Sequence, residues 1–409
     1  MAFCNAQTEN SSPYNYYFSP EFLLGKTAPS NENFPDLRLH KGYYLQFGKH
    51  QNQNPDEWAY RLNYPTTGIS LGVSDLGNQK KIGYQISLMP FAEFDIFTIK
   101  QNPVNLFVGM GAAYFTRKFD KNDNYINRAV STDLTWSFRL FAYYPFLKTE
   151  QIDFRIGAGY FHQSNGHTRF PNNGFNSFLG SVSANFNFDK QEKNKNLTEE
   201  KLDFKPTSSY YLMVNAGLGF NSFSDNYNTL KNVYAFDASF GKKFNQTFKV
   251  GVGFYYRFYE HYYDYISTNQ FLVRDGEEFS NLKNNPVWNA STLGFFISGE
   301  MILLNHFALE ARVGINFRKP AYAIDWRYNQ GWDNTPREIP ENWILGEFNS
   351  KYKLKKLISS KLGLKYYLIS MKENPVNNFY IAASIHTNLG LADFTEFSLG
   401  YVYNFQFFS

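Results

Sequence analysis

A histidine and a serine two residues apart, His162 and Ser164, are the best candidates for chemistry in this chain. A serine hydroxyl is a weak nucleophile until a neighbouring imidazole removes its proton. Residues i and i+2 of a β-strand share one face, so an imidazole at 162 can reach a hydroxyl at 164 if this segment is a strand. Asn165 or nearby backbone N–H groups would supply donors to an oxyanion. The pair therefore predicts serine-type ester hydrolysis.

A third group is needed to fix the tautomer of the imidazole. This group is usually a carboxylate, although an asparagine serves in some convergent triads. The segment that follows the pair returns through a loop to Asn176, which leads into a second alternating run. Asn176 is therefore the candidate third member of the site.

Two predicted strands, 152–164 and 176–188, must position these residues. Each strand alternates strictly, and extending the apolar face of the first leads to His162 and Ser164. The corresponding face of the second strand begins at Asn176. We therefore expect the three side chains to cluster on the outside of a barrel, near its extracellular rim. Polar groups that face lipid are costly unless they are hydrogen-bonded or functional.

The composition predicts a membrane barrel rather than a soluble protein. Aromatic residues make up 20% of the 409 residues, yet the mean hydropathy is -0.46. No run of apolar residues is long enough for a membrane helix. An apolar, aromatic outer wall around a polar lumen gives this combination. The net charge of +4 is mild, and no basic patch interleaved with aromatic residues predicts binding to nucleic acid.

Alternation with a period of two runs through most of the chain. It is clearest over 394–407, where aromatic and apolar residues alternate with small or polar ones. The predicted fold is all-β: a transmembrane up-and-down antiparallel barrel of about fourteen strands, within a range of 12–16. The strands are expected at 68–75, 81–97, 104–115, 131–143, 152–164, 176–188, 210–220, 232–241, 247–260, 290–302, 306–318, 355–371, 377–388 and 394–407.

The connections predict the orientation and the domains. With a periplasmic C-terminus, the long connections fall outside and the short ones inside, as in outer-membrane barrels. The exception is 189–207, rich in Lys and Glu, which is expected to be a flexible periplasmic insertion or to mark a lost strand. Residues 1–66 are assigned to an N-terminal segment, with an extra hairpin as an alternative. Residues 67–409 are assigned to the barrel, with 67–188 and 208–409 on either side of the insertion.

The N-terminus predicts an export-signal remnant. Cys4 and Ala6 are small residues at the −3 and −1 positions of a signal-peptidase cut after Ala6. A disordered N-terminus is the alternative. Cys4 is the only cysteine, which rules out an internal disulfide framework.

His-x-Ser-Asn followed by Pro-Asn-x-Gly resembles the outer-membrane lipid A 3-O-deacylase family, also called acyloxyacyl hydrolase. The resemblance extends over about 81–188, and the ending over 392–401 is similar to long Bacteroidetes-type relatives. It implies a bacterial outer-membrane barrel with a membrane-facing site near the outer leaflet, which removes an ester-linked acyl chain from lipid A.

By this resemblance His162 is the general base, Ser164 the nucleophile and Asn165 an oxyanion-hole residue. The family's acidic position falls on Asn176, which implies an asparagine orienter, an acid recruited from elsewhere or a weakened enzyme. Arg169, beside the motif, and basic residues of the loop 116–130 are candidates to pair with lipid A phosphates. The expected partners are lipid A or lipopolysaccharide, the bilayer and the barrel-assembly machinery.

Other assignments follow from strand parity and spacing. His167 is expected in a solvated loop, and His386 is expected to face the lumen, with Glu396. No group of residues has the spacing of metal ligands, and no cofactor is expected. The competing hypothesis is a non-enzymatic porin or a transporter of hydrophobic molecules, because fourteen strands leave a passable lumen.

Overall fold

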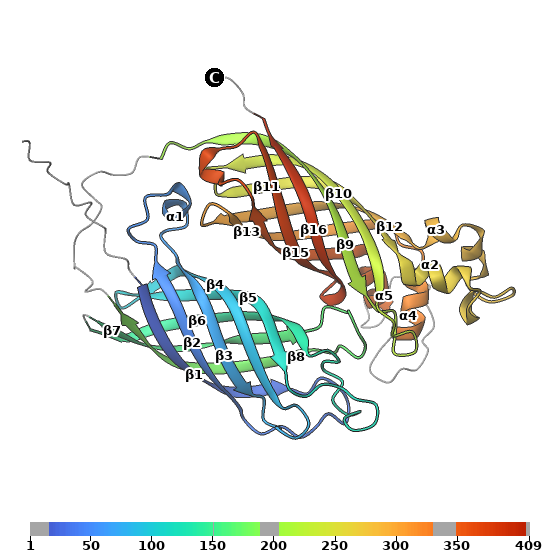
Figure 1. The fold of residues 1–409 in the computed structure, drawn as a ribbon, viewed down its shortest axis with the longest axis horizontal. Coiled ribbons are helices and arrows are strands. Elements are labelled where there is room, and N and C mark those ends of the chain that lie inside the picture. The colour runs from blue at the N-terminus through green and yellow to red at the C-terminus, as the bar shows by residue number, and fades with distance from the viewer. Residues whose placement is uncertain (1–15, 150, 189–203, 330–348, 406–409) are drawn as a thin grey trace, which may run out of the picture.

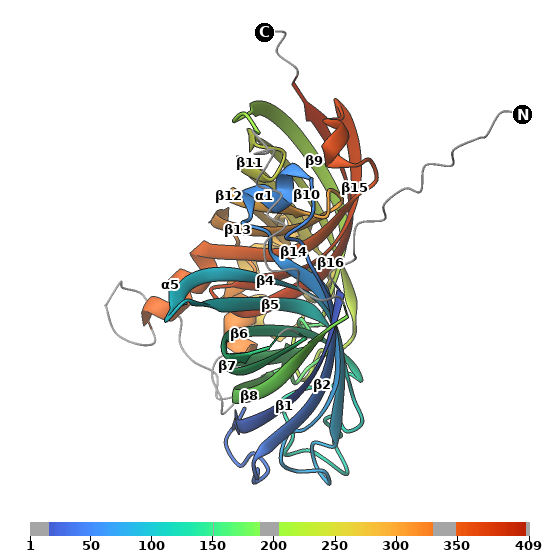
Figure 2. The same ribbon diagram turned by 90° about the vertical axis from the view of Figure 1, so that its left-hand side faces the viewer.

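In a computed structural model, which describes residues 16–149, 151–188, 204–329 and 349–405, sixteen antiparallel strands close into two barrels of eight strands each. The two barrels lie side by side, with the longer loops of both toward one end (Figure 1). A view turned by 90° shows the strands of each barrel curving around a closed wall (Figure 2). The predicted all-β class is confirmed, and the total number of strands falls in the predicted range, but the strands form two barrels instead of the single barrel that the sequence predicted.

The first barrel closes between its first and last strands, where Phe22 pairs with Val182. Its strands are β1 (Tyr16–Ala28), β2 (His40–His50), β3 (Thr66–Asp75), β4 (Tyr84–Ile99), β5 (Asn102–Phe115), β6 (Leu134–Lys148), β7 (Ile152–Ser164) and β8 (Phe175–Asn187). A short helix, α1 (Glu57–Arg61), lies between β2 and β3. Residues 16–50 therefore form the hairpin considered above as an alternative.

The second barrel closes where Leu399 pairs with Ala216. Its strands are β9 (Ser208–Asn221), β10 (Lys231–Phe244), β11 (Phe248–Tyr259), β12 (Ser291–Leu303), β13 (Phe307–Arg318), β14 (Ile358–Tyr367), β15 (Asn377–Asn388) and β16 (Leu391–Asn404). The connections carry α2 (Glu260–Ser267), η2 (Phe271–Val273), η3 (Ser280–Asn284), α3 (Pro286–Asn289), α4 (Tyr322–Asn329), α5 (Asn349–Leu357) and η4 (Met371–Glu373). Within the described residues, none of these helices has the length and apolar character needed to cross a membrane.

The outer walls of both barrels are apolar, as the alternation predicts. On β16 Phe397 is 58% exposed and Leu399 68%, whereas the alternating Ser398 and Glu396 are buried. Val252 on β11 and Phe178 on β8 are likewise exposed. An apolar exterior around a polar interior is the pattern of a barrel wall in contact with lipid.

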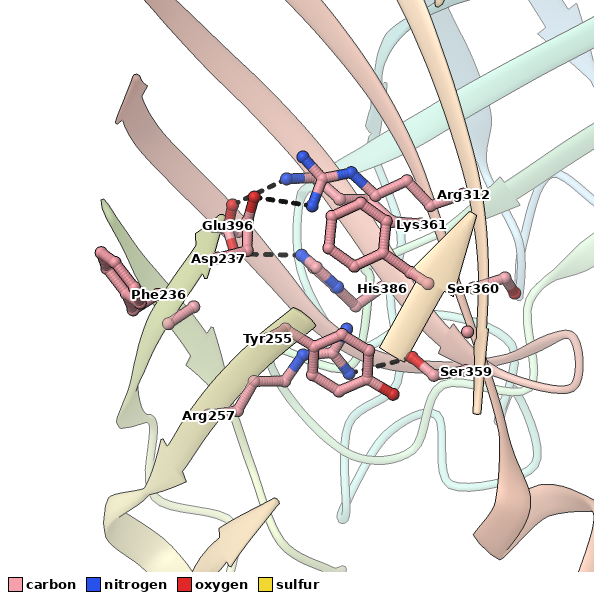
Figure 3. A pocket seen from close by; sticks show the side chains of 13 residues that line it. Phe236, Asp237, Tyr255, Arg257, Arg312, Ser359, Ser360, Lys361, His386 and Glu396 are labelled. Carbon is pink, nitrogen blue, oxygen red and sulfur yellow. Dashed lines mark hydrogen bonds and ion pairs between the residues drawn. The ribbon is translucent and has the colours of Figure 1, made fainter. Parts of the chain in front are cut away.

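Side chains fill the lumen of each barrel. In the first barrel, Glu21 accepts hydrogen bonds at 2.6 Å from both Arg139 and Tyr143. In the second, Arg312 pairs with Asp237 at 2.8 Å, and His386 and Lys361 point to Glu396 (Figure 3). The void among these residues is about 10 Å³, about the room of one water molecule.

Eight strands leave an interior just wide enough for side chains. The porin hypothesis rested on a single lumen of about fourteen strands, and the described residues form no such lumen. In the sequence the charged connection 189–207 falls between β8 and β9, the last strand of the first barrel and the first strand of the second. Its residues 189–203 lie outside the described part of the chain, as do Cys4 and Ala6.

Candidate functional site on the outer wall

His162 and Asn176 form a hydrogen-bonded pair on the outside of the first barrel. They are register partners on β7 and β8, and Nδ1 of His162 lies 2.8 Å from Oδ1 of Asn176. Both side chains are half-buried, in line with the exposed Ile156 and Phe178 of the same faces. The residues inside the wall at this level, Phe161 and Gln163, are fully buried.

The contacts of Asn176 fix the tautomer of the imidazole. Its Oδ1 also accepts a hydrogen bond from the Tyr160 hydroxyl. Because a carbonyl oxygen only accepts, Nδ1 of His162 must carry the proton in this pair. The lone pair is then on Nε2, which is the arrangement a general base needs toward a serine. Asn176 thus orients the ring as a carboxylate would, but it brings no negative charge to stabilise an imidazolium.

Ser164 lies at the end of β7, opposite Trp136 of β6. Its side chain is only 4% exposed, because the following loop folds over it. Its Oγ accepts a hydrogen bond from the backbone N–H of Gly166 at 3.1 Å and from Nδ2 of Asn172 at 3.4 Å. Two donors therefore already point at the hydroxyl. Among the described residues, the hydrogen bonds of the His162 ring go to Asn176 and Tyr160, and none joins it to Oγ of Ser164.

Asn165, the expected oxyanion-hole residue, makes its side-chain hydrogen bonds to other groups than Ser164. Its Nδ2 donates to Oγ of Ser131 at 3.1 Å and to the carbonyl of Arg169 at 2.7 Å, and its Oδ1 accepts from the N–H of His167. Both of its amide protons are thus committed to the loop. Asn172, whose Oδ1 accepts from the N–H of Asn165 at 2.8 Å, is the side chain that reaches the serine.

Gly174 brings the loop close to both catalytic candidates. Its φ is +73°, and an added Cβ would lie 3.0 Å from Cε1 of His162 and 3.6 Å from Cβ of Ser164. Only glycine takes this backbone conformation without strain and leaves room for the imidazole. The glycine of the Pro-Asn-x-Gly segment therefore has a steric function at this site.

Aromatic rings surround the histidine on the outer wall. The ring of His162 stacks with Tyr160 at 6.2 Å between centroids and lies 6.1 Å from Phe138. On one side the ring of Phe138 stacks with Trp136, and on the other side the ring of Tyr160 contacts Phe178. An apolar strip thus extends on both sides of the pair, which suits a substrate with a hydrocarbon chain.

The loop that carries the site is held by the second barrel. The N–H of Ser222 donates to the carbonyl of His167 at 2.9 Å, and Asn228 exchanges two hydrogen bonds with the backbone of Phe170. Thr395 of β16 accepts from Nε1 of Trp136 at 3.0 Å and donates to the carbonyl of Gly166 at 3.3 Å. The second barrel therefore contributes to the geometry around Ser164.

The sequence predicts a solvated position for His167, but the structure buries much of its ring. Its ring is half-buried against Phe170, with 4.6 Å between centroids. Burial lowers the pKa of His167 to about 4, with smaller effects from Asp393 and Lys319. At neutral pH the ring is uncharged and part of the junction between the barrels.

The basic residues near the site differ in what they contact. Lys118 pairs with Asp133 at 2.6 Å, and Arg128 pairs with Asp225 of the second barrel. Arg169 keeps an exposed side chain beside the loop. Of the three, Arg169 alone combines exposure with a place next to the site.

Sequence reasoning missed Tyr160 and Asn172 as parts of the site. Asn172 stands in the Pro-Asn-x-Gly segment, which was the available signal. Tyr160 shares the outward parity of His162 at i−2, and its partner Asn176 arrives from another strand. The contacts from Thr395 and Ser222 had no local signal, because they join residues more than 50 positions apart.

A protein family and several solved structures are similar to this chain. The lipid A 3-O-deacylase (PagL) family profile matches residues 44–185. A solved structure of the outer-membrane enzyme PagL is 17% identical, with a TM-score of 0.29, and the match covers 40% of this chain and 97% of that chain. Omp33 of Acinetobacter baumannii is 9% identical, with a TM-score of 0.15, and the match covers 96% of this chain and 100% of that chain. OprD of Pseudomonas aeruginosa is 9% identical, with a TM-score of 0.20 and 98% of each chain covered. A search among curated proteins found no match.

The matched segment contains β3 to β7, most of β2 and β8, and all residues of the candidate site. The predicted resemblance to lipid A 3-O-deacylases is thus confirmed over residues 44–185. Together with two closed barrels that have apolar outer walls, the match also confirms the predicted location in the bacterial outer membrane.

Proposed function

We propose that the protein is an outer-membrane serine-type ester hydrolase that removes an ester-linked acyl chain from lipid A or a related outer-leaflet lipid. The observation that carries the proposal is the outward hydrogen-bonded pair of His162 and Asn176, two residues from Ser164, at the loop end of the wall. The family match over the same residues supports the substrate class.

In the proposed reaction, Oγ of Ser164 attacks the acyl carbonyl while Nε2 of His162 takes the hydroxyl proton. The C–O bond to the sugar then breaks, and His162 returns the proton to the leaving hydroxyl. Water, deprotonated by the same imidazole, attacks the acyl-serine and releases the fatty acid and the free serine. Each step balances without a cofactor.

The oxyanion of the tetrahedral intermediate would be held by the two donors that reach Ser164 in the resting structure. These are the N–H of Gly166 and Nδ2 of Asn172. Preorganised donors of this kind typically contribute about 10²–10³-fold each to kcat. Arg169, exposed beside the loop, is placed to pair with a lipid A phosphate.

Because Asn176 is neutral, we expect it to affect the rate of hydrolysis. A carboxylate orients the imidazole and stabilises its positive charge, whereas the Asn176 amide supplies only the first effect. We therefore propose that the chain is a slow hydrolase as it stands, rather than an inactive barrel.

The test is mass spectrometry of lipid A from cells that express the protein or its Ser164→Ala variant. Loss of one acyl chain is expected with the native protein and not with the variant, and a heat-shifted gel band checks that both are folded barrels. Identical lipid A in all cells, with both barrels folded, would overturn the proposed function.

A further inference from the structure

An apolar cavity of about 930 Å³ lies between the outer walls of the two barrels. Outward-facing side chains line it, among them Ile69, Pro90 and Met110 of the first barrel and Leu309, Ala383 and Phe397 of the second. This volume lies within the range of roughly 300–1,000 Å³ that is usual for ligand sites.

The second barrel forms one wall of this cavity. Met110 shares the outward parity of Tyr114, which is 48% exposed, yet Met110 is only 4% exposed. On β15 the outward Ile385 is buried in the same way, at 6%. These side chains point away from their own lumens and are covered by the neighbouring barrel.

Polar contacts at both ends hold the walls together around the cavity. At the loop end, Trp136 donates to Thr395 at 3.0 Å. At the turn end, Asp56 accepts from Asn305 at 2.8 Å and from Lys372 at 2.6 Å, and α1 lies beside the second barrel (Figure 1). The barrels are tied at their rims, and the apolar space lies between these two sets of contacts.

The cavity lies next to the candidate site by two independent routes. In register, His162 lies opposite Phe138 and Phe138 lies opposite Met110. Neighbouring strands are about 4.8 Å apart, so Met110 is about 10 Å from His162 across the wall. On β16, Phe397 lines the cavity, and two residues away Thr395 binds the Trp136 that lies opposite Ser164.

Lys365 is the one charged residue in the lining of the cavity, and its charge does not face the cavity. The ammonium group of Lys365 donates to Glu300 at 2.7 Å and to Glu310 at 2.9 Å inside the second barrel. The space therefore suits a hydrocarbon chain and excludes an ionic headgroup.

We propose that this cavity binds the acyl chain that carries the scissile ester, with the ester at Ser164 and the chain passing over Phe138 between the barrels. The proposal rests on the proposed function. It assigns to the second barrel one half of the acyl-chain site, and hence a share in selecting the length of the chain.

The residues at the two ends of the cavity indicate which lipid chain can enter it. Toward the loop end the lining includes Met110, the register partner of Phe138, and toward the turn end it includes Leu304, next to the Asn305 that binds Asp56. A chain attached at the outer leaflet can therefore enter beside the serine. A phospholipid from the opposite leaflet would have to pass that polar contact.

The test fills the cavity. Ala383→Trp places a large ring in it, and Val252→Trp places the same ring on the lipid-facing side of β11, outside the cavity. We expect Ala383→Trp to lower kcat/KM for p-nitrophenyl myristate by about tenfold or more, with kcat/KM for p-nitrophenyl butyrate unchanged. Val252→Trp should leave both values unchanged. An Ala383→Trp variant that keeps the native ratio of the two values would overturn the proposal.

A cross-linking arm separates this proposal from the proposed function. A myristate ester that carries a diazirine is photolysed with the Ser164→Ala variant, and the labelled peptides are mapped. Labels concentrated on β5 and β16 and lost in the double variant with Ala383→Trp support the cavity. Labels spread over all outward faces, or lost equally with Val252→Trp, overturn it. If the native protein hydrolyses neither ester and leaves lipid A unchanged, the proposed function fails, and the labels still decide whether acyl chains bind.

Discussion

The seventh strand of each barrel carries a histidine near its loop end, and the two histidines point in opposite directions. On β7, His162 faces outward and binds Asn176 at 2.8 Å. On β15, His386 faces inward, with Nε2 3.0 Å from Glu396 and its ring stacked on Phe394 at 4.0 Å. Because side chains alternate along a strand, a change of one residue in parity exchanges the bilayer for the lumen. The same residue type is thus a site candidate in one barrel and part of the packed interior in the other.

The interiors of the barrels explain why chemistry is expected on the outer wall. Both lumens hold buried ion pairs, such as Arg155 with Glu93 at 2.7 Å and Lys365 with Glu300 at 2.7 Å. Removing one partner of a buried pair typically costs about 3–5 kcal/mol. These charges neutralise one another, and the space around them is filled. A lipid can reach a polar side chain only on the outside, and His162 and Asn176 are there.

Exchanging the two histidines for glutamine tests this contrast most directly. We expect His162→Gln to lower kcat/KM for ester hydrolysis by roughly 10³-fold or more, because the general base is lost. His386→Gln should leave kcat/KM within about twofold and lower the unfolding free energy by about 1 kcal/mol, since a contact to Glu396 is weakened. The measurements are ester hydrolysis in detergent and thermal unfolding. An equal loss of activity in both variants would remove the distinction between the barrels.

A carboxylate at position 176 should sharpen the contrast. Asn176→Asp keeps the size of the side chain and the reach of 2.8 Å to Nδ1 of His162, and it adds the charge that stabilises an imidazolium. We expect kcat to rise by at least tenfold, within a limit of about 10⁴ set by the reverse change in a serine triad. Asn176→Leu is the control and should lower kcat. A kcat that is unchanged by both substitutions would mean that Asn176 does not orient the base.

The hairpins that follow the two histidines offer a matched pair of glycines. Gly174 and Gly390 both have a positive φ, of 73° and 84°, but an added Cβ meets His162 and Gln163 at the first and nothing within 4 Å at the second. Gly390→Ala should cost about 1 kcal/mol of stability through the backbone alone. Gly174→Ala should cost more and also lower kcat/KM by about tenfold, because the imidazole must move. Comparable activity in the two variants would show that the loop does not position the histidine.

Most of the fold was predictable, because alternation with a period of two is a local property. All fourteen expected strands occur, and those at 152–164 and 377–388 have the predicted bounds. The first strand, β1, is not among the expected strands, because Pro20 and Glu21 interrupt its alternating pattern. In the structure Glu21 is buried in the lumen beside Arg139.

The division into two barrels depends on closure, which is not local. The pairing of β1 with β8 and of β9 with β16 joins residues at least 148 positions apart, and the alternation is the same for one large barrel or two small ones. The one signal was the connection 189–207, too long for a periplasmic turn, which separates eight strands from eight.

The candidate site was predictable in part for the same reason. Parity alone placed His162 and Asn176 on one outward face, and the hydrogen bond between them agrees with it. The expected role of Asn165 in an oxyanion hole stays a prediction. In the structure its Nδ2 donates to Ser131, and Asn172 is the amide that reaches the serine, because the fold of the loop decides which amide points there. Whether His162 serves as base to Ser164 stays a prediction.

The smallest effect concerns the junction of the barrels, and it depends on pH. Burial holds the pKa of His167 at about 4, below the ordinary value of about 6.5, so folding favours the neutral ring. The stabilisation is fully present above about pH 6.5 and is lost as the pH falls toward 4. His261 of α2, whose pKa burial lowers to about 3, should act in the same direction. Amide exchange of residues 165–170 should therefore be faster at about pH 5 than at about pH 7.5, after correction for the intrinsic rate, and His167→Gln should reduce this difference. Exchange that does not change with pH would mean that the loop is held without the neutral ring, and the two barrels would then be joined chiefly by the backbone bonds from Ser222 and Asn228.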